Sequence, residues 1–170
     1  MHVVAMGVAA TGKSSVAERL AKELDLEFVE GDDLHPQSNI DKMSAGAPLD
    51  DDDRRPWLQA IADLIAEQHK AGTAAVVTCS ALKRSYRDIL RSGLPDSDIF
   101  FLHLHTDFDV LFERMGQRKR HFMPPALLQS QFDTLEPLED DEAGVMVDVA
   151  PPLDTVAAES VNAVRSAYAR

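Results

Sequence analysis

The sequence contains a single cysteine, Cys79, among 170 residues, so no disulfide can form within the chain. Disulfide-free chains are typical of reducing compartments, and we therefore expect a cytoplasmic protein. No apolar run approaches the roughly 20 residues that a membrane-spanning helix needs. The first residues also lack a basic stretch followed by a long apolar run, which argues against a secretory signal.

Basic residues are scarce as well. The chain has 17 Lys and Arg against 29 Asp and Glu, which gives a formal net charge of −12. Nucleic acids and anionic membranes are bound by basic faces that neutralise phosphates, so neither is expected as a partner. Two local basic clusters, at residues 83–91 and 114–120, stand out against this background. They indicate either small anionic ligands held in a cleft or solvated helix faces.

Short apolar runs alternate with segments of helical periodicity along the whole chain, and we see one domain covering residues 1–170. The expected strands lie at 3–6, 26–29, 74–78, 99–104 and 145–149. The expected helices lie at 13–24, 36–46, 57–72, 81–91, 108–115 and 153–168, with one more before the last strand. This alternation predicts a three-layer α/β fold, with a five-stranded parallel sheet and helices on both faces. Ligands of such sheets bind at the carboxyl ends of the strands.

Residues 7–14 read Gly-Val-Ala-Ala-Thr-Gly-Lys-Ser and match the phosphate-binding pattern G-x-x-x-x-G-K-[ST] between a predicted strand and a predicted helix. In this motif, backbone N–H groups and the helix start surround the phosphates. Lys13 is expected to reach the β- and γ-phosphates, and the Ser14 hydroxyl to ligate Mg²⁺. The predicted nucleotide-binding residues of the loop are Gly7, Ala9, Ala10, Thr11, Gly12, Lys13, Ser14 and Ser15.

The loop does not reveal how the triphosphate is used. The N-K-x-D stretch by which GTPases read guanine is missing, and Asp141 to Gly144 fit D-x-x-G only as an accidental turn. A small-molecule kinase and an ATP-driven binding or regulatory module both remain open. Dependence of ATP turnover on an added acceptor would separate them.

Longer blocks of the sequence resemble the gluconokinase family, P-loop kinases similar to shikimate and nucleoside-monophosphate kinases. The blocks are GDDLHP at 31–36, NIDKM at 39–43, PLDDDDRRPWL at 48–58, CSALK at 79–83 with YRD beyond, and RKRHF at 118–122 followed by QF and TLE. Asp33 and Arg120 depart from the family pattern, where an aromatic and a glycine are common. The resemblance implies ATP and Mg²⁺ as cofactors, D-gluconate as substrate, a homodimer and a mobile lid at about 116–125. Another sugar acid or a shikimate-like acceptor is the alternative.

The same resemblance implies roles for acidic residues after the second strand. Asp32 is the candidate catalytic base that contacts the acceptor hydroxyl, and the alternative is a turn acid. Glu30, two positions earlier, is either a group that holds a Mg²⁺-bound water or a plain surface acid. His35 either binds a gluconate hydroxyl or makes a local structural bond.

Basic residues are expected to bind the anionic parts of the two substrates. Arg54, Lys83 and Arg87 are the candidates for the gluconate carboxylate, with Arg84 as a further competitor. In the lid, the catalytic Arg118, and with it Arg120, is expected to close over the triphosphate. Arg114 is expected to stack on adenine, and His121 to contact the substrate.

Three further features favour structural interpretations. The acids at 50–53 fit the start of a helix, whose dipole favours negative charge. His103 and His105 could bind a metal, but without a third ligand they are better explained as a hydrogen-bonded strand face. Cys79 is expected to be a small packed residue.

Overall fold

The computed structural model of the 170-residue chain describes residues 1–117 and 125–169. Its described part contains one sheet of five parallel strands in the order β2-β3-β1-β4-β5. The strands are β1 (His2–Met6), β2 (Glu27–Val29), β3 (Ala75–Thr78), β4 (Ile99–His105) and β5 (Gly144–Asp148). The predicted sheet is confirmed, and each strand lies within two residues of its expected bounds.

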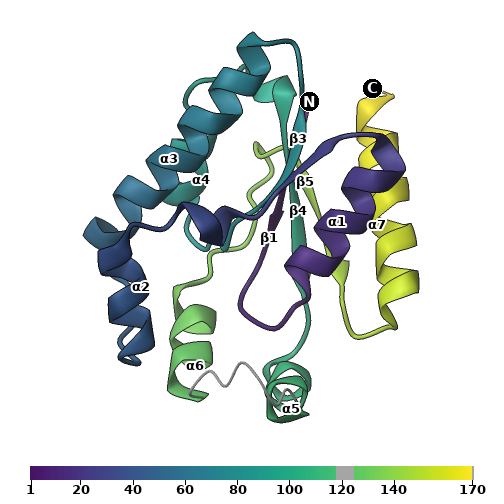
Figure 1. Ribbon diagram of the computed structural model, residues 1–170. Coiled ribbons are helices and arrows are strands. Elements are labelled where there is room, and N and C mark those ends of the chain that lie inside the picture. Colours follow the sequence, from purple (N-terminus) through teal and green to yellow (C-terminus); the bar gives the residue numbers. More distant parts are fainter. Residues whose placement is uncertain (118–124, 170) are drawn as a thin grey trace.

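Helices cover both faces of this sheet (Figure 1). Helices α1 (Lys13–Leu24) and α7 (Leu153–Tyr168) lie on one face, and α3 (Asp51–Lys70) and α4 (Arg84–Arg91) on the other. Helices α2 (Gln37–Ser44), α5 (Phe108–Gln117) and α6 (Pro125–Thr134) lie toward the carboxyl ends of the strands, and the short 3-10 turns η1 (Gly31–Leu34) and η2 (Asp96–Asp98) precede α2 and β4. The three-layer α/β arrangement is therefore as predicted.

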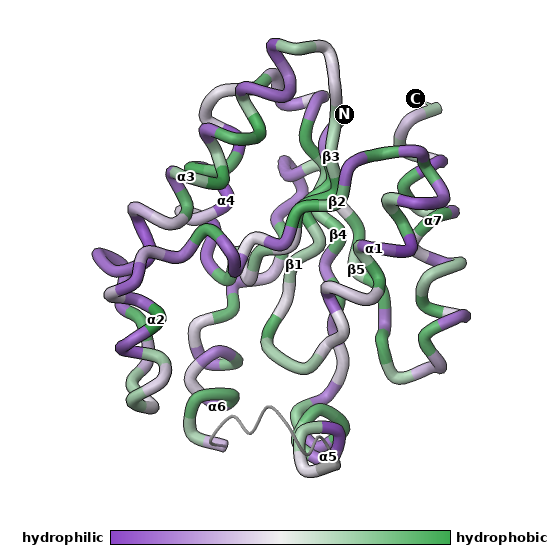
Figure 2. The backbone as a smooth tube through the Cα atoms, in the orientation of Figure 1, coloured by the Kyte–Doolittle hydropathy of each residue, from purple (hydrophilic) through white to green (hydrophobic). Residues whose placement is uncertain are grey.

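The core lies between the sheet and its two helix layers, and both the strands and the inner faces of the helices contribute apolar residues to it (Figure 2). Every residue of β1 is buried, because a parallel strand covered on both faces has no solvent side. Trp57 and Ile61 of α3 are buried against one face, and Val16 and Leu20 of α1 against the other. This packing fixes the ends of β1, β2 and β3, from which the site is built.

The acidic run at 50–53 has the structural role expected of it. The side chain of Asp50 accepts a hydrogen bond from the backbone N–H of Asp53 at 2.8 Å, and Asp53 accepts from the N–H of Asp50 at 2.9 Å. This reciprocal capping box satisfies two donors that would otherwise lack partners at the start of α3. The helix consequently begins well before its first buried apolar residue, Trp57.

The histidine pair on β4, His103 and His105, is less completely hydrogen-bonded than expected. His103 is buried, but its Nε2 atom and the Nδ1 atom of His105 have no hydrogen-bond partner within the described residues. The prediction of a hydrogen-bonded strand face was therefore wrong for these two atoms. The described residues also contain no group of three or more potential metal ligands.

Cys79 is buried, as expected, and burial raises the pKa of its thiol to about 12. A thiol with so high a pKa is almost entirely protonated at neutral pH and is a poor nucleophile. Among residues 1–117 and 125–169, no helix is long and apolar enough to span a membrane.

Candidate active site

The loop between β1 and α1 has the geometry of a phosphate-binding loop. Gly7 has φ of 139°, and a Cβ atom at this position would lie 2.3 Å from the carbonyl oxygen of Leu104. Only glycine fits such a close approach between the loop and β4. Gly12, with φ of 82°, then turns the chain into α1, which begins at Lys13. The loop thus lies at the amino end of a helix, where N–H groups and the helix dipole favour anions.

Ala10 is unusual within this loop, because its φ of 65° lies in the left-handed region. A side chain there costs roughly 1–2 kcal/mol, since Cβ crowds the following carbonyl group. The loop therefore carries backbone strain at a position where glycine would carry none.

Two hydroxyl groups and one carboxylate meet at the start of α1. Ser14 Oγ donates to Glu30 Oε2 at 2.5 Å, and the hydroxyl of Thr78 at the end of β3 donates to the other oxygen of Glu30. Thr78 Oγ1 also accepts the N–H of Gly31 at 3.0 Å, which ties the end of β2 to β3. A serine hydroxyl beside a carboxylate is an oxygen donor set of the kind that suits Mg²⁺. The residues present therefore fit the expected metal.

Asp32 lies at the start of η1, at the open end of the sheet. The loss of surrounding solvent raises the pKa of its carboxyl group, the charges of Glu30 and Asp33 raise it further, and the positive charge of Lys13 opposes the shift. The side chain is still 77% exposed, so a ligand can reach it. Asp32 and the phosphate-binding loop with Lys13 follow β2 and β1 at the same end of the parallel sheet.

His35 packs flat against Trp57, with ring centroids 4.0 Å apart and an interplanar angle of 16°. The indole N–H of Trp57 donates to the carbonyl oxygen of Gly31 at 2.7 Å, so the stacking partner is itself held in place. Burial, and to a lesser degree the charge of Arg54, lower the pKa of His35 to about 4. The imidazole is therefore neutral near pH 7.

Arg54 is the basic candidate that the structure brings to this site. Its guanidinium donates to the carbonyl oxygen of Leu49 at 3.2 Å and lies 3.5 Å from Ser80 Oγ. It also lies over the ring of Tyr86, 5.6 Å from the centroid. Since the charge of Arg54 affects the pKa of His35, this guanidinium is placed near the proposed acceptor position.

Lys83 is placed less favourably for an anion. Its ammonium group pairs with Asp51, 2.9 Å from Oδ1 and 3.1 Å from Oδ2. The hollow that it lines is also bordered by Leu49, Tyr86, Thr134 and the three acids 50–52. Three acids around one ammonium group make this hollow a poor site for a carboxylate.

Arg87 requires a correction. Its side chain is fully buried, and it pairs with Glu142, whose side chain is also fully buried, with Nε 2.6 Å from Oε1. Its other donors reach the carbonyl oxygens of Ala81, Leu82, Glu136 and Pro137. The expected role of Arg87 as a gluconate ligand is therefore abandoned, because the guanidinium has no exposed surface. The competitor Arg84 is likewise paired, with Asp88, Glu139 and Asp141.

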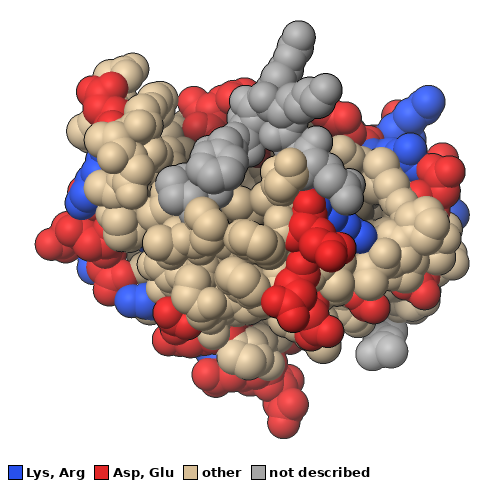
Figure 3. Space-filling model, turned by 90° about the horizontal axis from the view of Figure 1, so that it is seen from below, with Lys and Arg blue, Asp and Glu red and all other residues tan. Residues whose placement is uncertain are grey.

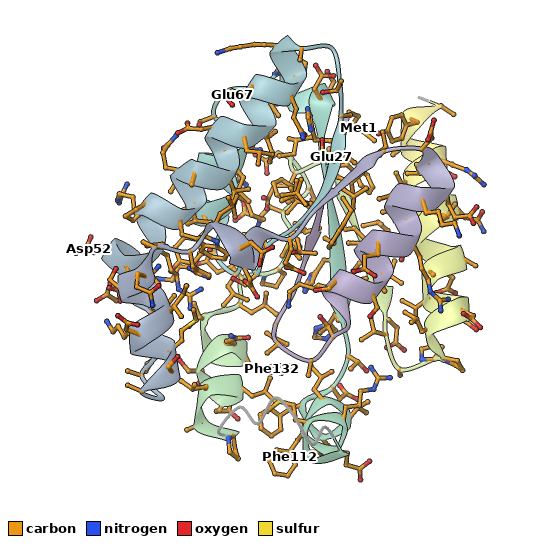
Figure 4. All side chains as sticks on the ribbon, in the orientation of Figure 1. Met1, Glu27, Asp52, Glu67, Phe112 and Phe132 are labelled. Carbon is orange, nitrogen blue, oxygen red and sulfur yellow. The ribbon has the colours of Figure 1, made fainter. Side chains whose placement is uncertain are left out.

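The expected lid residues Arg118, Arg120 and His121 lie outside the described residues. Arg114, at the other end of α5 from β4, donates to the carbonyl oxygens of Val149 at 2.6 Å and Ala150 at 3.1 Å. Its guanidinium is thus fixed beside the loop that follows β5. Helices α5 and α6 pack through aromatic rings, since Phe108 of α5 meets Phe132 of α6 edge-on at 5.5 Å. Figure 4 labels Phe132 of α6 and, on α5, Phe112.

Gln131 of α6 was missed as a site residue, although the resemblance includes it in a quoted block. Its Oε1 accepts the backbone N–H of Ala9 at 2.6 Å, which joins α6 to the phosphate-binding loop. Ser80 was included only as part of the CSALK block at 79–83, and its carbonyl oxygen accepts the N–H of Gly7 at 3.2 Å. Viewed toward the carboxyl ends of the strands, Figure 3 shows more acidic than basic side chains among the residues that are coloured.

Comparison with known proteins supports the same family as the sequence blocks. A family model described as an AAA domain matches residues 3–138. The thermoresistant gluconokinase of Escherichia coli is 44% identical over 95% of this chain and 92% of its own length, and the gluconokinase of Gluconobacter oxydans is 49% identical over 94% and 88%. The chain belongs to the gluconokinase family. The crystal structure of a gluconokinase from Sinorhizobium meliloti, 48% identical, superposes with a TM-score of 0.90 over 98% of this chain and 93% of that one.

Membership in the gluconokinase family makes this protein an enzyme with a P-loop kinase fold. Family membership also implies use of a nucleotide, which agrees with the loop geometry at residues 7–14. Identity to these relatives extends over nearly the whole chain, so the family covers the acceptor side around Asp32 and Arg54 as well as the phosphate-binding loop.

Proposed function

We propose that this protein transfers the γ-phosphoryl group of ATP to D-gluconate and forms 6-phospho-D-gluconate. The observation that carries the proposal is the position of Asp32, which follows β2 at the same end of the parallel sheet as the phosphate-binding loop that follows β1. The relatives named gluconokinase supply the identity of the acceptor. The site geometry therefore supports phosphoryl transfer, and the gluconokinase relatives support gluconate as the acceptor.

The nucleotide phosphates are proposed to bind the N–H groups of the loop at residues 7–14, with Lys13 neutralising the transferring group. Ser14 would hold Mg²⁺ directly, and Glu30, 2.5 Å from the serine hydroxyl, would hold one of its waters. When bound, the metal neutralises charge on the terminal phosphates and orients them. Arg118 and Arg120 are proposed to add positive charge from the lid, and Arg114 to border the adenine.

The acceptor hydroxyl is proposed to lie against Asp32. Phosphoryl transfer has a loose transition state, so the carboxylate mainly orients the hydroxyl and accepts its proton late in the reaction. A raised pKa suits this role, because a more basic carboxylate accepts a proton more readily. His35 and His121 are proposed to contact other parts of the sugar acid.

The gluconate carboxylate is proposed to pair with Arg54. Lys83 stays a weaker candidate because Asp51 already holds its ammonium group. A planar guanidinium can bind a carboxylate through two parallel hydrogen bonds. A simple aldose has no carboxylate and cannot form this paired contact.

An acceptor screen with ADP release as readout tests the proposal. We expect D-gluconate to give the highest kcat/KM, well above glucose, shikimate and nucleoside monophosphates. Glucose keeps the hydroxyls and lacks the carboxylate, so it leaves the basic group unpaired. That loss should cost about 2–4 kcal/mol, or about thirtyfold to a thousandfold in kcat/KM. Equal use of glucose and gluconate would contradict the assignment.

Variants of two neighbouring arginines make the test specific to the carboxylate. Arg54→Lys should narrow the difference in kcat/KM between gluconate and glucose by raising KM for gluconate, because an ammonium group cannot form the paired contact. Arg55→Lys is the matched control, since Arg55 is the next residue on α3 and is exposed. If both variants behaved alike, Arg54 would not be the carboxylate ligand.

A further inference from the structure

A buried asparagine, Asn39 of α2, links the start of α3 to the ring of His35. Its Nδ2 atom donates to the backbone carbonyl oxygen of Asp53 at 2.8 Å and lies 3.2 Å from Nδ1 of His35. The Asp53 carbonyl can only accept, so the Asn39 atom that faces it must be the amide nitrogen and not the oxygen. The same nitrogen therefore also faces the histidine.

This contact determines which nitrogen of His35 carries the proton. An amide nitrogen donates and does not accept, so Nδ1 of His35 must accept and cannot be protonated. In the neutral ring the proton then lies on Nε2. Because Asn39 is only 2% exposed, water has little access to compete for Nδ1.

The protonated nitrogen points toward the site. Nε2 of His35 lies 3.7 Å from Oδ1 of Asp32, which is longer than a direct hydrogen bond. An acceptor hydroxyl beside both atoms could accept from Nε2–H while it donates its own proton to Asp32. The stacking of the ring on Trp57 fixes the direction in which Nε2–H points.

We propose that Asn39 is a positioning residue that holds His35 in the Nε2–H form, so that His35 donates a hydrogen bond to the acceptor hydroxyl at Asp32. The role of Asp32 in this statement depends on the proposed function, whereas the proton position on His35 does not. His35 thus orients the hydroxyl oxygen, and Asp32 takes the proton.

The charged groups around His35 come from three elements. Asp32 lies on η1, Arg54 approaches from α3, and Asp53 of α3 pairs through its carboxylate with Lys42 of α2 at 2.5 Å. Arg54 disfavours a charged ring and Asp32 favours one. Burial is the larger cause of the lowered pKa of His35 and the charge of Arg54 adds to it, so the ring is neutral near pH 7.

The proton position can be measured directly in the ligand-free protein. Nitrogen-15 NMR of labelled histidine distinguishes the two neutral forms, and we expect the Nε2–H form for His35 at pH 7. This reading needs no substrate, so it stands or falls separately from the choice of gluconate. An Nδ1–H form would overturn the proposal.

Asn39→Asp supplies a second test, through the pH profile of turnover. A carboxylate at position 39 can only accept a hydrogen bond, so the His35 ring must donate from Nδ1. In the neutral ring Nε2 then carries no proton, and an acceptor faces Asp32 in place of a donor. Only the protonated ring of the variant keeps Nε2–H, and the new carboxylate raises the pKa of His35. Turnover of the variant should therefore rise as pH falls through that pKa, a limb that the wild type lacks. A loss that is the same at every pH would mean that Asn39 acts only through packing.

A pair of variants that leaves Asn39 intact completes the test. The amide nitrogen of glutamine can take the place of Nε2, whereas that of asparagine lies nearer to Nδ1. We expect His35→Gln to keep kcat within a few-fold and His35→Asn to lose about tenfold to a hundredfold, the value of one hydrogen bond to a charged or reacting group. Equal losses of kcat in the two variants would show that His35 does not act as a hydrogen-bond donor.

Discussion

Replacing Arg87 tests whether this arginine supports the fold or the substrate. The five N–H groups of its guanidinium lie within hydrogen-bond distance of six acceptor atoms, two of Glu142 and four backbone carbonyl oxygens of the chain segments around residues 81 and 136. Arg87→Met removes all of them and leaves the buried Glu142 without its main partner. Breaking a buried pair in this way costs about 3–5 kcal/mol. With a typical urea dependence, the unfolding midpoint should fall by roughly 2 M.

The free energy of unfolding should also depend on pH differently in the two proteins. Burial alone would raise the pKa of Glu142, but hydrogen bonds from Arg87 and from the N–H of Glu139, with the charges of Arg87 and Arg84, hold it below its ordinary value of 4.5. A lowered pKa adds stability above pH 4.5 that is lost as pH falls through the folded-state value. In Arg87→Met, burial dominates and the pKa rises, so stability is instead lost as pH increases from about 5 to 7. The two proteins should thus show opposite slopes.

Urea unfolding at several pH values, followed by circular dichroism, measures both effects. Arg91→Met is the matched control on the same helix, because Arg91 forms only a surface pair with Asp88 and should change stability by less than about 1 kcal/mol. The reasoning would be refuted if Arg87→Met unfolded like the control and raised KM for gluconate. That result would make Arg87 a candidate substrate ligand again.

Three other variants probe the loop and the base. Lys13→Ala should lower phosphoryl transfer at least about a hundredfold in a coupled ADP assay, because a preorganised charge at the transferring phosphate is lost; near-normal turnover would exclude this role. Asp32→Asn should lower kcat strongly while the Kd for ATP, measured by calorimetry, stays within a few-fold, since Asp32 is proposed to lie on the acceptor side. Ala10→Gly should leave thermal stability unchanged or raise it by up to about 1 kcal/mol, because relief of the left-handed strain offsets the entropy that glycine adds to the unfolded chain. Ala9→Gly, where no positive φ needs relief, should lower stability, and equal effects of the two substitutions would contradict the strain at Ala10.

Local features of the fold could be predicted from the sequence. Helix α7 has the bounds that periodicity suggested, and α1 begins at the lysine of the phosphate-binding loop as the motif requires. Such features depend on neighbouring residues, which the sequence shows directly. The acids at 50–53 were interpretable for the same reason, because a capping box spans only four residues.

The roles of the arginines could not be predicted in this way. Arg54 and Arg87 are both basic residues near strand ends, and neither has a local signal that separates substrate binding from burial. What separates them is Glu142, which is 55 positions from Arg87 along the chain and belongs to the D-x-x-G segment that we interpreted as a turn without further role. The link between Asn39 and His35 is close in sequence, but its meaning depends on the position of the Asp53 carbonyl group.

The order of the strands explains how the two substrates can meet. In the order β2-β3-β1-β4-β5, the phosphate-binding loop follows the central strand β1. Asp32 and Ser80 follow β2 and β3 on one side, and the carbonyl groups that hold Arg114 follow β5 on the other. The proposed acceptor groups are therefore separated from the proposed adenine side by β1, so we expect the transferring phosphate to lie over the end of this strand. Lys13 begins the helix that follows β1, and its charge acts on Asp32 although the two residues follow different strands.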